Sequence, residues 1–189
     1  MNRNTRKPQS TFVDCLNFQA REMIGFLELG MKDDALKIAE KILSSESLGK
    51  NEFIAALETI LHFEHTENCH AHKDFIAAGF LKLSKTDQKD ACATVFQFYY
   101  HIDEVETAAN YIPRHYVDSG VLRASMFALL ELGQFKQAKR ILRIARRQLK
   151  EAYDDEERST LLGMFAEHDS FVKHGGFTFN MNRRTNFEE

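Results

Sequence analysis

Two segments about 100 residues apart carry the same short pattern, and this repetition restricts the fold more than any other feature. Residues 26–43 read FLELGMKDDALKIAEKIL, and residues 129–146 read LLELGQFKQAKRILRIAR. In both, Leu-Glu-Leu-Gly precedes a polar turn, and an Ala follows at the fifth position after the Gly. Glycine readily adopts the left-handed conformation that ends many helices. The pattern therefore predicts two helical hairpins, with their turns at Gly30 and Gly133.

The rest of the chain also favours helices. Apolar residues recur at spacings of three and four, with further turns expected at residues 66–68 and 102–103. The segment TFVD (11–14) resembles a capping box before the first helix, and the last helix is expected over about 156–173. VFQFYY (95–100) is rich in strand-forming residues, but its helical neighbours and the lack of a second strand favour a helix.

A further pattern recurs in the second helix of each pair. Four alanines each open such a helix, at separations of 36, 37 and 30 residues, and apolar or small residues follow at helical spacing. The four sets are Ala35-Ala39-Ile42, Ala71-Phe75-Ala78, Ala108-Ile112 and Ala138-Leu142-Ala145. A unit of this size cannot bury its apolar face alone and stacks on its neighbours. We therefore expect about four helical hairpins and a C-terminal capping helix.

This pattern resembles the tetratricopeptide repeat (TPR), a helix–turn–helix unit of similar length. The turn glycines Gly30 and Gly133 and the small-large-small second helices carry the resemblance, which covers roughly residues 12–150. Phe135 stands where the family favours Tyr, whereas the Trp of the family's first helix is missing. The resemblance implies an all-α fold, a TPR-like α-solenoid that forms a single domain over residues 11–174. An irregular all-α bundle is the alternative.

The two ends of the chain differ from this repeat domain. Residues 1–10 are basic and polar without apolar periodicity, so we expect a flexible arm. In residues 175–189 two glycines precede Phe177, Phe179 and Met181, which alternate with polar residues. This tail is expected either to dock in an apolar groove, of its own chain or of a second copy, or to be disordered.

The resemblance implies non-catalytic recognition of another protein, as in an adaptor or a chaperone. TPR relatives bind extended or helical peptides along the first helices of their hairpins. The corresponding positions define a predicted partner-binding groove: Ile24, Leu27, Ile60, Phe63, Gln97, Tyr100, Arg123 and Phe127. These residues are mostly apolar, which suits a hydrophobic peptide, although the same types are also typical of a core. An exposed apolar strip would also favour self-association.

A basic stripe on the helix expected over residues 134–150 supports an alternative function. Its seven cations are Lys136, Lys139, Arg140, Arg143, Arg146, Arg147 and Lys150, and the helix contains no acidic residue. At 100° per residue the cations fall within an arc of roughly 120°, opposite the apolar face. The remainder of the chain carries a formal charge of −10, from 18 basic and 28 acidic residues. Such a stripe can attract nucleic acid, another phosphate ligand or an acidic protein, and it can also be a solvated face or pair with residues 154–157.

A cluster of His and Cys between residues 62 and 72 supports a second alternative, a metal-binding protein. The segment HFEHTENCHAH holds four of the eight His and one of the three Cys. The candidate ligands are His62, His65, Cys69 and His72, residue types that bind zinc. The spacing matches neither His-Glu-x-x-His nor a pair of Cys-x-x-Cys motifs. We therefore expect a polar hairpin tip and no metal.

We expect no enzyme activity and no cofactor. Cys69 and His70 are adjacent, so on a helix their side chains diverge by about 100° and are poorly placed as nucleophile and base. The sequence has no glycine-rich phosphate loop, no secretory signal, and no run of 18 apolar residues that could span a membrane. Three Cys at irregular spacing favour reduced thiols. These features predict a cytoplasmic protein without membrane contact.

Overall fold

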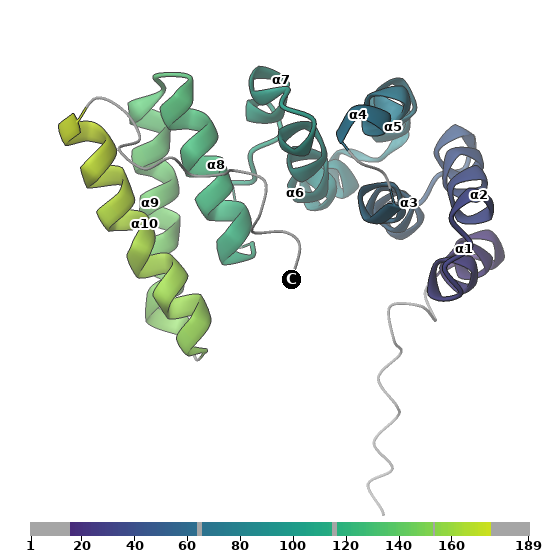
Figure 1. Cartoon of the computed structure of the whole chain (residues 1–189), viewed down its shortest axis with the longest axis horizontal. Coiled ribbons are helices and arrows are strands. Elements are labelled where there is room, and N and C mark those ends of the chain that lie inside the picture. The colour runs from purple at the N-terminus through teal and green to yellow at the C-terminus, as the bar shows by residue number, and fades with distance from the viewer. Residues whose placement is uncertain (1–15, 64–65, 115–116, 153, 175–189) are drawn as a thin grey trace, which may run out of the picture. The chain divides into compact units, whose positions relative to one another are not determined.

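The computed structural model of the chain describes residues 16–63, 66–114, 117–152 and 154–174 (Figure 1). The predicted arm, the TFVD segment, the tail and His65 lie outside these residues. The chain divides into two compact units, residues 1–104 and residues 105–189. Within the described residues every regular element is a helix, which confirms the all-α prediction.

The first unit contains the helices before residue 105. Its elements are α1 (Phe18–Glu28), α2 (Lys32–Ser44), α3 (Lys50–Phe63), the one-turn α4 (Thr66–Cys69), the 3₁₀ helix η2 (His70–His72), α5 (Lys73–Lys82) and α6 (Lys85–His101). The turn between α1 and α2 lies at Gly30, whose φ of +68° is the left-handed value that the repeated pattern predicted. VFQFYY forms part of α6, as predicted. The predicted turn at residues 66–68 is wrong, because these residues form α4.

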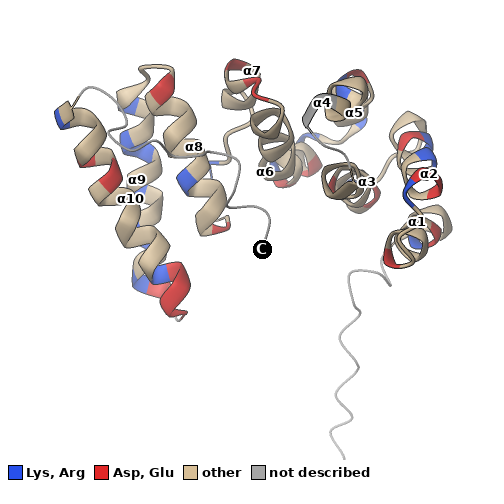
Figure 2. Ribbon diagram, viewed as in Figure 1, with Lys and Arg blue, Asp and Glu red and all other residues tan. Residues whose placement is uncertain are grey.

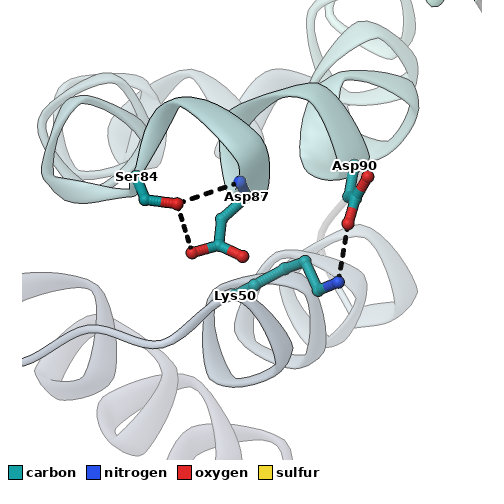
Figure 3. A network of polar contacts seen from close by, with 4 residues as sticks. All are labelled: Lys50, Ser84, Asp87 and Asp90. Atoms are coloured by element: carbon teal, nitrogen blue, oxygen red, sulfur yellow. Dashed lines mark hydrogen bonds and ion pairs between the residues drawn. The ribbon is translucent and has the colours of Figure 1, made fainter.

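Polar side chains fix where the helices of this unit begin. Asn17 caps α1, where its Oδ1 accepts a hydrogen bond from the Ala20 amide at 2.9 Å. Ser84 caps α6 in the same way, and its hydroxyl also donates to Asp87 Oδ2 at 2.7 Å (Figure 3). Beside this cap, Lys50 Nζ at the start of α3 lies 2.7 Å from Asp90 Oδ2, and this hydrogen bond raises the Lys50 pKa. An exposed pair of this kind adds at most about 1 kcal/mol and mainly fixes the position of α3 against α6.

The helices of the first unit pack on their neighbours in the sequence, α1 on α2 and α2 on α3, and also on more distant helices. Besides its partner in the hairpin, α1 contacts α3, and α3 contacts α6, while α2 contacts α5. The core between them holds large side chains without solvent exposure, including Phe53, Phe96 and Phe98. Gly79 of α5 allows a close approach in this core, since a Cβ there would lie 3.3 Å from Leu48 Cδ2 and from Phe53 Cε2. Glycine at position 79 therefore allows α5 to pack closely against its neighbours.

The set of residues predicted to be buried in η2 and α5 is wrong. Ala71, Phe75 and Ala78 are all exposed, and the exposed fraction of Phe75 reaches 41%. The buried positions with the same spacing lie one residue later, at His72, Ile76 and Gly79. The helix carries apolar or small residues on both faces. The face that packs on the core is the one with glycine at the point of closest approach.

The second unit contains α7 (Val105–Ala109), α8 (Ser119–Glu131), α9 (Phe135–Glu151) and α10 (Asp155–His174). Gly133, with φ +67°, forms the turn between α8 and α9, as predicted. Helix α10 packs against both α8 and α9. The core among these three helices is formed by Leu122, Met126, Leu129, Leu130, Ala138, Ile141, Ala145, Ala152, Leu161 and Met164. The predicted turn at residues 102–103, just before this unit, is also present, with Asp103 at φ 61°.

Candidate functional site

The basic stripe lies on α9 and is fully displayed to solvent. All seven of its cations are exposed, whereas Ala138, Ile141 and Ala145 on the opposite side are buried in the core of the second unit. Basic segments recur along α9 in Figure 2. The apolar residues therefore hold the helix in place, and the cations are left available for contacts outside the unit.

The cations of the stripe are not neutralised by described parts of the chain. Among the residues that the structure describes, no carboxylate lies within ion-pair distance of any of the seven. The alternative in which the stripe pairs with residues 154–157 is therefore not seen in the described ranges. One cation has a different neighbour: the Arg146 guanidinium lies 5.4 Å from the ring centroid of Phe165 on α10. This cation–π contact fixes one edge of the stripe against α10.

Acidic residues close one end of the stripe. Glu151, Asp154, Asp155 and Glu156 are exposed and follow the last cation, Lys150. Figure 2 shows this acidic cluster at the beginning of α10. A ligand that follows the stripe therefore meets positive charge only between Lys136 and Lys150, a distance of about 21 Å on an α-helix.

The predicted groove residues of the first unit lie on its first helices and differ in exposure. Ile24 and Leu27 on α1, Phe63 at the end of α3, and Gln97 and Tyr100 on α6 are all half-buried. The Tyr100 ring stacks on buried Phe96, with ring centroids 5.5 Å apart.

Ile60 does not fit the predicted groove. It has no exposed surface and belongs to the core, so it cannot contact a partner in this conformation. Position 60 shows that the resemblance to the repeat does not by itself distinguish a groove residue from a core residue one turn away.

Of the two predicted groove residues of the second unit, Arg123 binds a carboxylate of α10 and Phe127 packs on the core. Arg123 of α8 donates from Nε to Glu167 Oε2 at 3.1 Å, and its Nη2 donates to the other oxygen of the same carboxylate. The guanidinium also lies 5.5 Å from the centroid of the Phe127 ring, which packs against the core of this unit. In the second unit Arg123 therefore attaches α10 to α8.

The described members of the His and Cys cluster, His62, Cys69 and His72, do not form a group that could hold a metal ion. His62 is exposed and lies edge-on to Phe63, whereas Cys69 is buried. His72 is also buried, and its Nδ1 lies 3.2 Å from Glu40 Oε1 on α2. In the part of the chain that the structure describes, no three His, Cys, Asp or Glu side chains are grouped closely enough to hold a metal ion.

Three residues of α10 were missed by the sequence reasoning. Phe165 borders the stripe, Leu162 lies one turn before it with an exposed fraction of 56%, and Glu167 binds Arg123. The spacing of Leu162 and Phe165 places them on one side of a helix, but the sequence does not show that this side adjoins α9.

Within the described ranges, no helix combines the length and apolar character needed to cross a bilayer.

Comparison of the chain with protein-family models, with curated proteins and with solved structures found no match.

Proposed function

We propose that this chain is a non-catalytic protein-recognition module built as a TPR-like α-solenoid. The observation that carries the proposal is the packing order in the first unit, where α1, α3 and α6 contact in sequence while α2 contacts α5. First helices packed beside first helices, and second beside second, are the arrangement of stacked hairpins. Stacked hairpins present the side chains of successive first helices on one continuous surface, which is suited to an extended or helical peptide.

The proposed groove comprises Ile24, Leu27, Phe63, Gln97 and Tyr100 of the first unit. All five side chains are half-buried, so each keeps some surface for a partner while its remainder is held by the fold. Aromatic anchors usually contribute most to the affinity of such a surface, with losses of about 2 kcal/mol or more on truncation to Ala. We assign the central anchoring role to Tyr100, because buried Phe96 holds its ring in a fixed orientation.

Substitution of Tyr100 by Ala tests this function. Interacting proteins would first be isolated from the native cell by affinity capture, identified by mass spectrometry and purified for titration against the wild-type chain. Tyr100→Ala is expected to weaken binding of the partner by more than about tenfold. The matched control is Phe75→Ala on α5, an exposed aromatic outside the proposed groove, which should leave binding unchanged.

Melting temperatures of both variants separate binding from folding. If Tyr100→Ala only unfolds the protein, or if Phe75→Ala weakens binding equally, the groove hypothesis is wrong. Recovery of nucleic acid without a protein partner would contradict the proposed function as a whole.

A further inference from the structure

We propose that the basic stripe of α9, with Leu162 and Phe165 of α10 at its edge, binds an acidic helical segment of a partner protein. The segment would be about 14 residues long, with carboxylates at every third or fourth position and one apolar side chain. This inference deepens the proposed recognition function, on which it rests for the class of partner, by adding a second surface of different chemistry.

The cations have the spacing and the availability that this ligand requires. From Lys136 to Lys150, each cation has another cation three or four residues away along the helix. The two lie about one helical turn, or about 5.4 Å, apart. The carboxylates along one face of an acidic helix recur at the same interval. None of the seven cations has an ion-pair partner among the described residues, so binding of such a helix breaks no internal pair. Four of them are arginines, which can bind a carboxylate through two parallel hydrogen bonds.

The apolar edge points to a protein ligand. Phe165 lies under the guanidinium of Arg146 and is half-buried, and Leu162 on the same side of α10 exposes 56% of its surface. An apolar side chain on the acidic segment would cover Leu162 while its carboxylates reach the stripe. A phosphate backbone has no group that gains from contact with Leu162.

The limits of the stripe also disfavour nucleic acid. All seven cations of the stripe lie on one helix, and the exposed acidic residues Glu151, Asp154, Asp155 and Glu156 follow them at one end. Single-strand sites place aromatic side chains between the cations, whereas α9 carries its only aromatic residue, Phe135, before the first cation. A short segment can end before the acidic cluster, whereas a longer polyanion would be repelled there.

A fluorescence-anisotropy titration of the full chain tests the proposal with defined probes. The first probe is a labelled helical peptide of about 14 residues, with Glu at every third or fourth position and one Leu; the second is a single-stranded RNA of equal charge. At about 150 mM salt the wild-type chain is expected to bind the peptide at least about tenfold more tightly than the RNA. Tighter binding of the RNA, or no binding of the peptide, would overturn the proposal.

Charge reversal in the stripe is compared with the same change elsewhere. Arg143→Glu combined with Arg147→Glu should weaken peptide binding by at least about tenfold, whereas Lys37→Glu with Lys41→Glu on α2 should change it by less than about twofold. All four side chains are exposed, so both double variants are expected to keep their stability within about half a kcal/mol per substitution. Equal weakening by both double variants would show that net charge, and not the stripe, binds the peptide.

A third variant tests the apolar edge and does not depend on the stability of the charge variants. Leu162→Ser should weaken binding of the Leu-containing peptide by about threefold. Binding of an otherwise identical peptide with Ala in place of Leu should not change. Unchanged binding of both peptides would remove Leu162 from the site and contradict the proposal. Because these probes are synthetic, a negative result would contradict only the proposal for the stripe. The Tyr100 experiment with the native partner tests the proposed function separately.

Discussion

At the scale of single residues, Gly79 shows how one missing side chain sets the distance between helices. An added Cβ would come closest to the side chains of Leu48 and Phe53, and it would approach the backbone oxygen of Leu43 to 3.4 Å. The approach to the oxygen is an ordinary van der Waals contact, whereas a Cβ 3.3 Å from Leu48 Cδ2 and from Phe53 Cε2 would be closer than most Cβ contacts. Glycine at this position therefore lets α5 pack closely without displacing these two side chains.

Gly79→Val is predicted to lower the free energy of unfolding by about 2 kcal/mol, because overpacking of a filled core costs roughly 1–3 kcal/mol. The matched control is Gly25→Val in α1, where an added Cβ meets nothing within 4 Å. Valine has a slightly better helix propensity than glycine, so this control should be neutral or weakly stabilising. Denaturant unfolding of both variants measures the difference, and equal midpoints would show that α5 can shift to accept the larger residue.

Single residues also show how far the sequence could predict the fold. Gly30 and Gly133 were predictable because a positive φ excludes most other residue types, so the turn is encoded in the residue itself. Ala71 was misplaced because alanine fits equally well on a buried and on an exposed face. The choice between that face and the one with Ile76 depends on contacts with other helices, which a local pattern does not contain.

At the scale of elements, the attachment of α10 was the least predictable feature. Its existence as a capping helix was expected, but the contact that holds it on α8 joins Arg123 to Glu167, 44 residues further along the chain. The family resemblance assigned Arg123 and Phe127 to a binding groove, because nothing in the repeat pattern shows that Arg123 binds a carboxylate on another helix of the same chain. The stripe on α9, in contrast, was predictable in full, since helical geometry alone places its cations on one face.

Arg123→Ala is predicted to destabilise the packing of α10 by about 1–3 kcal/mol, because it leaves the partly buried Glu167 carboxylate without its two hydrogen bonds. Arg123→Lys keeps the charge but cannot form the bidentate contact, so its loss should be intermediate. Hydrogen exchange of the α10 amides, followed by mass spectrometry, measures both effects. If protection of α10 is the same in all three proteins, the apolar contacts of α10 hold it without this ion pair.

At the scale of the whole molecule, the chain consists of two units, each with a core of its own. In the first unit the core includes Met23 of α1, and in the second it includes Met164 of α10; neither side chain has any exposed surface. The repeat pattern runs through both units without marking a boundary, so the sequence alone suggested one continuous array. A separate core within each unit is the physical condition for separate cooperative unfolding.

The two units are therefore predicted to unfold independently, and two matched substitutions test this. Met164→Ala should cost roughly 2–5 kcal/mol, typical of a buried Met replaced by Ala, and should raise hydrogen exchange in α8, α9 and α10 while α1, α2 and α3 keep their protection. Met23→Ala should have the reciprocal effect. If either substitution lowered protection evenly from α1 to α10, the chain would unfold as one cooperative array. In that case the groove of the first unit and the stripe of the second would respond to each other's ligands, because stabilising one unit would stabilise the other.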